Sequence, residues 1–198
     1  MLSVGITGSL GTGKTAVARL LARQGARVLD ADKIAHQLIA PGGRCFPAVV
    51  QQFGRGILKQ GRIDRAKLAR IVFADRGQLK KLERIIHPAV GEEIQKKLKE
   101  FAKHKKNKMT AVEVPLLFEA GLDRLMDFVI VVKVERQLQI KRIRAQRNIT
   151  KADIARRLRS QMPLKEKIRL AYFVVDNSGN IKKTRTQVQN IWKQLIKK

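Results

Sequence analysis

A glycine-rich loop close to the start of the chain constrains the fold more than any other feature. Residues 8–15 read G-S-L-G-T-G-K-T and match the pattern G-x-x-x-x-G-K-[ST]. The apolar residues 2–6 before the loop are typical of a buried strand, and residues 16–24 after it carry apolar side chains at helical spacing. A strand, such a loop and a helix in this order form a cradle for phosphate. The alternative is a glycine-rich turn that matches the pattern by chance.

Each type of residue in the loop has a chemical reason to be there. Gly8, Gly11 and Gly13 let the backbone curl so that its N–H groups point inward at a phosphate group. The N-terminus of the following helix adds a favourable partial positive charge. Lys14 is expected to reach the β- and γ-phosphates, and the hydroxyl of Thr15 is expected to ligate Mg²⁺. We therefore predict that the chain binds a nucleoside triphosphate with magnesium.

The charge of the chain is strongly positive. Its 198 residues include 43 Lys and Arg against 16 Asp and Glu, a formal net charge of +27. A positive cleft steers anionic nucleotides, but it needs only a few of these cations. The excess is consistent with solvated helix faces and a proteome-wide basic bias, or with binding of nucleic acid. Because the chain has one Tyr and one Trp for stacking on bases, we predict that any nucleic-acid adhesion is incidental.

Membrane insertion and disulfide chemistry are not expected. No apolar run approaches the ~20 residues of a membrane-spanning helix, and the first strand begins too early to leave room for a signal peptide. Cys45 is the only cysteine, which excludes an intrachain disulfide and a cysteine-based metal cage. We expect a cytoplasmic location and a monomer.

The order of the predicted elements is typical of an α/β fold. Strands alternate with helices, which favours a parallel sheet with helical crossovers. The predicted strands are residues 2–6, 27–30, 110–114, 128–132 and 173–175. Residues 46–101 show helical periodicity and no convincing strand, and we interpret them as part of an inserted helical subdomain between the second and third strands.

Three observations favour a small-molecule kinase over a hydrolase or a motor. The chain is short, and its third strand ends in Val114–Pro115 rather than in a Walker-B aspartate. The second strand delivers Asp30 and Asp32 to the sheet edge where ligands bind in open α/β folds. Arginines cluster after the fourth strand, where a lid could neutralise the moving phosphoryl group. Asp32 is the candidate general base; the alternative is that it only caps its helix, and Asp30 could simply bond to backbone.

Further motifs, in a fixed order along the chain, resemble those of the dephospho-coenzyme A kinase family. After Thr7 and the loop they are D-A-D-x-x-A-H at 30–36, R-x-x-L-x-x-x-V-F at 65–73, H-P at 87–88, V-P-L-L-F-E at 114–119, Gln161 and V-D-N-S-G at 175–179. The resemblance covers roughly residues 2–195. It implies a single P-loop kinase domain with three parts. These are a five-stranded parallel core flanked by helices (about 1–40, 109–135 and 171–198), a helical substrate-binding insertion (about 41–108) and a small helical lid (about 136–170).

The resemblance also implies a reaction and a set of site residues. The reaction is transfer of the γ-phosphate of ATP to the ribose 3′-hydroxyl of dephospho-coenzyme A, which gives coenzyme A and ADP. The implied catalytic residues are Asp32 as general base, Lys14 and the lid residue Arg142. The implied ATP-binding residues are Gly8, Gly11, Thr12, Gly13, Lys14, Thr15, Ala16 and Asn177, with Thr15 on Mg²⁺. The implied substrate-binding residues are Thr7, Asp32, His36, Arg65, His87, Pro115 and Leu116.

Other interpretations of these residues stay open. His87 could only orient a turn with Pro88, and residues 115–117 could be mainly packing. Where the family usually has a second lid arginine this chain has Gln146 followed by Arg147, and His36 stands where the family often has arginine. Two rival functions remain: another small P-loop kinase with a different acceptor, and a basic nucleic-acid-binding protein whose nucleotide is regulatory.

Overall fold

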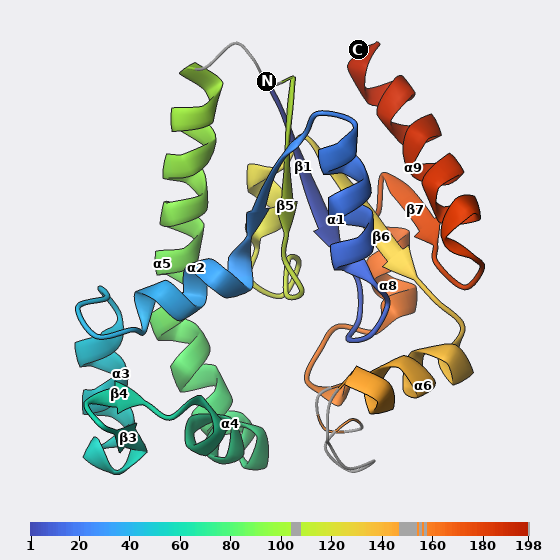
Figure 1. The fold of residues 1–198 in the computed structure, drawn as a ribbon. Helices are drawn as coiled ribbons and strands as arrows, with labels where there is room; N and C mark the ends of the chain where they lie inside the picture. Colours follow the sequence, from blue (N-terminus) through green and yellow to red (C-terminus); the bar gives the residue numbers. More distant parts are fainter. Residues whose placement is uncertain (104–107, 147–153, 155, 157, 198) are drawn as a thin grey trace. The chain divides into compact units, whose positions relative to one another are not determined.

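A five-stranded parallel sheet forms the centre of the first of two structural units (Figure 1). The structure is a computed structural model, which describes residues 1–103, 108–146, 154, 156 and 158–197. The first unit comprises Met1–Asp30 with Leu98–Lys198, and the second comprises Ala31–Lys97. The division falls after residue 30, so the helix that follows the second strand belongs to the second unit.

The strand order places the phosphate-binding loop at the middle of one sheet edge. The strands are β1 Leu2–Thr7, β2 Arg27–Asp30, β5 Met109–Glu113, β6 Phe128–Lys133 and β7 Phe173–Asp176. They lie in the order β2-β5-β1-β6-β7, and every neighbouring pair is parallel. The predicted parallel sheet is confirmed. Since all carboxyl ends share one edge, the loop after the central strand β1 lies beside the ends of β5 and β6.

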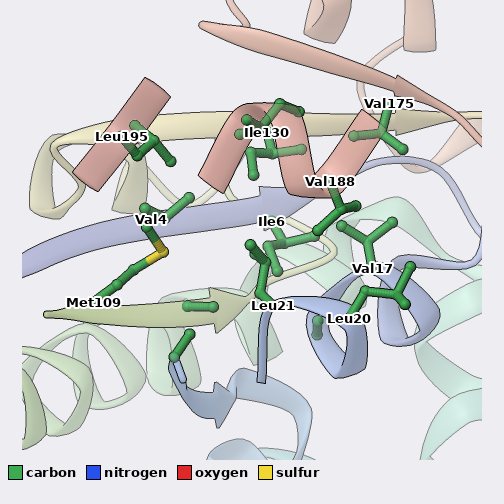
Figure 2. Packing of buried hydrophobic residues seen from close by; sticks show 14 of the residues in the cluster. Val4, Ile6, Val17, Leu20, Leu21, Met109, Ile130, Val175, Val188 and Leu195 are labelled. Atoms are coloured by element: carbon green, nitrogen blue, oxygen red, sulfur yellow. The ribbon is translucent and has the colours of Figure 1, made fainter. Parts of the chain in front are cut away.

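Two helices cover one face of this sheet. They are α1 Lys14–Arg23 and α9 Ile181–Ile196, the first and last helices of the chain, and they pack together. Figure 2 shows Leu21 of α1 and Val188 of α9 beside Ile6 of β1, and Val4 of β1 beside Met109 of β5. Continuous apolar runs such as β1 are needed because a parallel sheet is covered on both faces. This core fixes where α1 begins, and with it the position of the loop.

The remaining described elements of the first unit are a 3₁₀ turn and helices. They are the 3₁₀ turn η2 Leu122–Leu125, α6 Arg136–Gln146, α8 Leu164–Arg169 and the last turns of α5 Arg76–Lys103. The expected lid, residues 136–170, includes α6 and α8, and Arg147 falls outside the described residues. No helix among the described residues is long and apolar enough to cross a membrane.

The second unit is mainly helical and has an apolar core of its own. Its elements are α2 Ala31–Leu38, α3 Phe46–Phe53, η1 Arg55–Ile57, β3 Leu58–Lys59, β4 Arg62–Ile63, α4 Arg65–Ala74 and most of α5. The prediction that residues 46–101 contain no strand is wrong, because β3 and β4 form a small antiparallel hairpin. Its turn residues Gln60 and Gly61 both have positive φ (51° and 73°), which suits a two-residue hairpin turn. Strands of two residues are too short to show a periodicity.

Helix α5 corrects a second interpretation from the sequence. His87 and Pro88 lie inside this continuous helix, so they do not form a turn. Pro88 has no N–H to donate to the carbonyl of Arg84, and a kink is the usual consequence. Asp32 is likewise not an N-cap, since it is the second residue of α2, in the first turn.

Candidate active site

The phosphate-binding loop is packed tightly from two sides. Gly11 and Gly13 have φ of 78° and 88°, a region that side chains with a Cβ rarely adopt. A Cβ on Gly11 would collide with Ile143 of α6, and a Cβ on Gly13 would collide with the amide of Asn177. Helix α1 begins directly after Gly13, and no side chain among the described residues caps its amino end. The first N–H groups of α1 therefore face the loop. Only glycine fits at these two positions, and the loop is held in one shape.

Asn177 supports the loop from the end of β7. Its side chain is buried; the amide nitrogen donates to the carbonyl of Thr12 (2.9 Å), and the amide oxygen accepts from the hydroxyl of Thr184 (3.0 Å). Thr12 is itself buried, and its hydroxyl donates to the carbonyl of Ser9 (2.9 Å). In this structure, therefore, the amide of Asn177 and the hydroxyl of Thr12 hold the backbone of the loop.

The tip of the loop is held by two glutamines from the lid region. Gln139 of α6 donates to the carbonyl of Leu10 (2.6 Å), and the N–H of Leu10 donates to the side-chain oxygen of Gln161 (3.3 Å). Both backbone groups of this one loop residue are thus satisfied by side chains from the lid region. The conformation of the loop tip is coupled to the position of these two segments.

Two cationic side chains lie at the loop. The ammonium group of Lys14 donates to the carbonyls of Gly8 and Ser9 (both 3.1 Å), so it lies over the loop. Arg142 of α6 lies near Gly13, and within the described part of the chain its Nη1 is a buried nitrogen without a hydrogen-bond partner. Buried guanidinium nitrogens are normally bonded. An anion bound at the loop would supply an acceptor for this unsatisfied charged donor.

The hydroxyl of Thr15 lies beside an acidic side chain. It is exposed and donates to Oε1 of Glu113, the last residue of β5, at 2.7 Å. Among the described residues no group of three or more His, Cys, Asp or Glu side chains forms a metal cage. Mg²⁺ needs no such cage, because it is held by one or two protein oxygens with phosphates and waters. The oxygen atoms present therefore fit Mg²⁺ that arrives with a nucleotide.

Comparison with known proteins gives the family. The family profile of dephospho-CoA kinase matches residues 2–183. A dephospho-CoA kinase from Carboxydothermus hydrogenoformans is 41% identical over 201 residues, which cover 98% of this chain and 97% of that protein. The chain belongs to the dephospho-CoA kinase family. As a member of this family it is a phosphotransferase.

Solved structures agree with this family assignment. A dephospho-CoA kinase from Campylobacter jejuni superimposes with a TM-score of 0.71 at 27% identity, over 98% of this chain and 97% of that one. A shikimate kinase from Acinetobacter baumannii superimposes with a TM-score of 0.56 at 15% identity, over 100% of this chain and 94% of that one. At that identity the second likeness shows the fold alone, which is that of a P-loop kinase.

The family motif V-P-L-L-F-E, residues 114–119, is mostly inside the protein. Leu117 is fully buried against β1, where its methyl groups would meet a Cβ on Gly5. The carbonyl of Pro115 accepts from the hydroxyl of Thr7 (3.2 Å), whose side chain is completely buried. Pro115 and Leu116 are partly exposed. Thr7 therefore ties β1 to this motif, and a contact of Thr7, Pro115 or Leu116 with substrate stays a prediction.

Four of the predicted residues belong to the second unit. His36 of α2 and Arg65 of α4 are brought together, with Nη1 of Arg65 3.0 Å from Nδ1 of His36. The guanidinium of Arg65 only donates hydrogen bonds, and which ring nitrogen of His36 donates depends on its tautomer. Two side chains that can each donate to phosphate therefore lie side by side. Asp32 follows the end of β2 by two residues, and His87 is partly buried in α5. Their roles in binding stay predictions.

Sequence reasoning missed Glu113. The third strand was expected to span residues 110–114 and to end in Val114–Pro115 rather than in a Walker-B aspartate, and no role was given to Glu113, at which β5 ends. Glu113 pairs in register with Ile6 of β1 and Asp30 of β2. The available signal was an acidic residue at the end of an otherwise apolar strand. This signal can be interpreted only when β5 is known to lie beside β1. The order of the elements in the sequence does not show which strands are neighbours in the sheet.

Proposed function

We propose that this chain transfers the γ-phosphate of ATP to the ribose 3′-hydroxyl of dephospho-CoA, giving CoA and ADP. Family membership supports the substrate, and the phosphate-binding loop supports the nucleotide. The observation that carries the site assignment is the buried Nη1 of Arg142 beside Gly13, which has no hydrogen-bond partner in the part of the chain that the structure describes. A transferred phosphoryl group would give this nitrogen its missing acceptor.

The proposed roles follow from the chemistry of each group. Lys14 leaves its loop carbonyls for the β- and γ-phosphate oxygens, and Arg142 binds the γ-phosphoryl group as charge moves. Asp32 takes the proton of the 3′-hydroxyl while that oxygen forms a bond to the γ-phosphorus and the bond to the β–γ bridging oxygen breaks. Bound through Thr15, Mg²⁺ supplies neutralisation of phosphate charge. We place the carboxylate of Asp32 in the base role because it lies in the first turn of the helix after β2.

The residues of the second unit are proposed to bind dephospho-CoA. His36 and Arg65 can both donate to an anionic group of the acceptor, and their contact of 3.0 Å concentrates these donors at one place. Contacts of His87, Pro115 and Leu116 with dephospho-CoA are proposed from the family motifs.

The test is release of ADP from ATP·Mg²⁺ with a panel of acceptors. The panel holds dephospho-CoA, nucleoside monophosphates and no acceptor, and it is repeated with Asp32→Asn. Release with dephospho-CoA alone, severely reduced in the variant, supports the proposal. Release with another acceptor would leave the fold assignment intact and change the substrate. The protein would then be a different small P-loop kinase, as the first rival interpretation holds.

We also propose that the protein acts as a cytoplasmic monomer and that adhesion to nucleic acid is incidental. The single, buried Cys45 is compatible with a reducing compartment. Incidental adhesion would disappear near physiological salt, because it rests on release of counterions from phosphate. Sedimentation of the protein with and without RNA, at low and physiological salt, tests both the monomeric state and the incidental nature of the adhesion.

A further inference from the structure

The segment that leads into α8 is fastened to the phosphate-binding loop. The side-chain oxygen of Gln161 accepts the N–H of Leu10 at the tip of the loop (3.3 Å). The next residue, Met162, donates its backbone N–H to Oε1 of Glu119 (2.8 Å). Because Gln161 and Met162 are neighbours in the chain, the bond to Glu119 fixes the backbone from which the side chain of Gln161 reaches the loop.

Glu119 is itself held in place by a buried cation. The ammonium group of Lys167 lies 2.8 Å from Oε1 of Glu119 and donates to the carbonyl of Pro115 (2.8 Å). The same carbonyl accepts from the hydroxyl of Thr7, the last residue of β1 (3.2 Å). The network of hydrogen bonds therefore reaches the phosphate-binding loop at two points, directly before its first glycine and at its tip.

We propose that Glu119 is a positioning residue for the phosphate-binding loop. It fixes Gln161 against Leu10, so that the loop keeps the curvature in which its backbone N–H groups surround phosphate. Glu119 acts through Met162 and Gln161 and is assigned no contact with the reacting atoms. This inference rests on the proposed function in one respect, which is that the loop binds the phosphates of ATP.

The tip of the loop depends on support from outside. Gly11 and Gly13 have φ of 78° and 88°, and glycine loses more backbone freedom on ordering than any other residue. The two backbone groups of Leu10 are bonded to Gln139 and Gln161, which come from separate segments of the lid region. A loop tip that loses one of these bonds has to be ordered when phosphate binds, and that ordering lowers the affinity for nucleotide.

A carboxylate suits this junction because its two oxygens accept several hydrogen bonds at once. Oε1 of Glu119 accepts from Met162, and the ammonium group of Lys167 contacts both carboxylate oxygens (2.8 and 3.1 Å). Met162 lies just before α8 and Lys167 lies within it. Glu119 therefore holds the start of α8 from two sides, and its charge-assisted bonds give the carboxylate one orientation.

A purely structural role for the same contacts predicts a different result. The ion pair could serve only to hold α8 on residues 114–119, and its loss would then lower stability without changing the folded loop. Nucleotide affinity would be the same in every variant that is folded. A positioning role requires instead that nucleotide affinity depends on whether residue 119 can accept a hydrogen bond from Met162.

The experiment compares two double variants that differ in this one property. The alanine variant, Glu119→Ala with Lys167→Met, loses the ion pair and the acceptor for Met162. The glutamine variant, Glu119→Gln with Lys167→Met, loses the ion pair and keeps an acceptor. A non-hydrolysable ATP analogue with Mg²⁺ is titrated by calorimetry at a temperature at which every variant is folded. We expect the affinity to fall about fivefold in the alanine variant and to stay within about twofold of wild type in the glutamine variant.

Gln161→Leu tests the last step of the network and leaves the ion pair intact. It removes the acceptor of the Leu10 N–H and should also lower the affinity about fivefold. Combined with the alanine variant, it should lower the affinity no further, because Glu119 acts through Gln161. Exchange of the Leu10 amide proton, followed by NMR, should be faster in Gln161→Leu and in the alanine variant than in the glutamine variant.

Asp127→Ala is the matched control for a loss of stability. Asp127 accepts from the N–H (2.7 Å) and the hydroxyl (2.8 Å) of Ser3, near the end of β1 that is opposite the loop. This variant should be less stable than wild type and should bind the ATP analogue with unchanged affinity. Equal affinities in the two double variants, or a further loss on adding Gln161→Leu to the alanine variant, would overturn the proposal.

The outcome is separable from that of the proposed reaction, because the titrations contain no acceptor. If wild-type protein transfers phosphate to another acceptor while the two double variants differ in affinity, the substrate is wrong and the inference stands. If dephospho-CoA is phosphorylated while the two double variants bind the analogue equally, the reaction stands and the inference is wrong.

Discussion

Lys167 and Glu119 form an ion pair of 2.8 Å in which the lysine side chain is completely buried. The ammonium group also donates to the carbonyl of Pro115 (2.8 Å), and Glu119 accepts from the N–H of Met162 (2.8 Å). A buried ammonium is tolerated only when it is paired and fully hydrogen-bonded. This pair joins the family motif at residues 114–119 to α8, within the expected lid region.

Glu119→Ala should strongly destabilise the fold. It leaves the ammonium of Lys167 buried without its counter-charge, which costs about 3–5 kcal/mol in comparable pairs. Urea denaturation of the two proteins measures the loss. The double variant Glu119→Ala with Lys167→Met should recover part of it, because no uncompensated charge remains. A loss below about 1 kcal/mol in the single variant would contradict this account.

Gln139→Ala should weaken ATP binding. The variant leaves the carbonyl of Leu10 without its hydrogen bond to the lid helix, at a cost of about 0.5–1.5 kcal/mol, which corresponds to at most about tenfold in affinity. Calorimetric titration with a non-hydrolysable ATP analogue measures it. Gln137→Ala is the matched control, since Gln137 is an exposed residue on the same helix. Equal affinities for the two variants would show that the loop tip does not depend on Gln139.

Arg142→Ala should lower kcat by about 10²-fold or more without lowering the stability of the nucleotide-free protein. Its buried Nη1 has no partner among the described residues, so removing it costs little in folding. Steady-state kinetics and urea denaturation give the two readouts. Arg144→Ala, an exposed position on α6, should leave both unchanged. A large loss of stability in Arg142→Ala would instead mean that the guanidinium supports the fold.

Asp176 should contribute to stability only above acidic pH. The hydroxyl of Ser178, with the backbone N–H of Ser178 and the ion pair to Lys133, holds the pKa of Asp176 below its ordinary value of 3.8. A lowered folded-state pKa gives a contribution that is present above 3.8 and is lost as the pH falls through the folded-state value. The difference in free energy of unfolding between wild type and Asp176→Asn should therefore be constant above about pH 5 and shrink below it. A difference that does not change with pH would contradict this.

The elements around the phosphate-binding loop could be predicted because their signals are local. The loop pattern, the buried run of β1 and the apolar stripe of α9 each lie within a few residues of sequence. The hairpin β3–β4 gave no such signal, because each of its strands has two residues. Local patterns therefore predicted the sheet but not the hairpin in the second unit.

The contacts that shape the site depend on pairings distant in the chain. Lys167 is one of 43 basic residues, and nothing in its neighbourhood in the sequence marks it as buried. Gln139 and Gln161 bond to the backbone of Leu10, more than a hundred residues away. The contact of Glu113 with Thr15 can be inferred only when β5 is known to be the neighbour of β1. Such partners follow from the order of the strands in space.

The most direct test of the central claim is to locate the phosphate group that the enzyme transfers. Wild-type protein is incubated with ATP, Mg²⁺ and dephospho-CoA, and the product is examined by phosphorus NMR beside the same reaction with Asp32→Asn. We predict a new phosphate monoester on the ribose 3′-oxygen, formed at a rate lower by about 10²-fold or more in the variant. Phosphate on another oxygen, or an equal rate in the variant, would contradict the account.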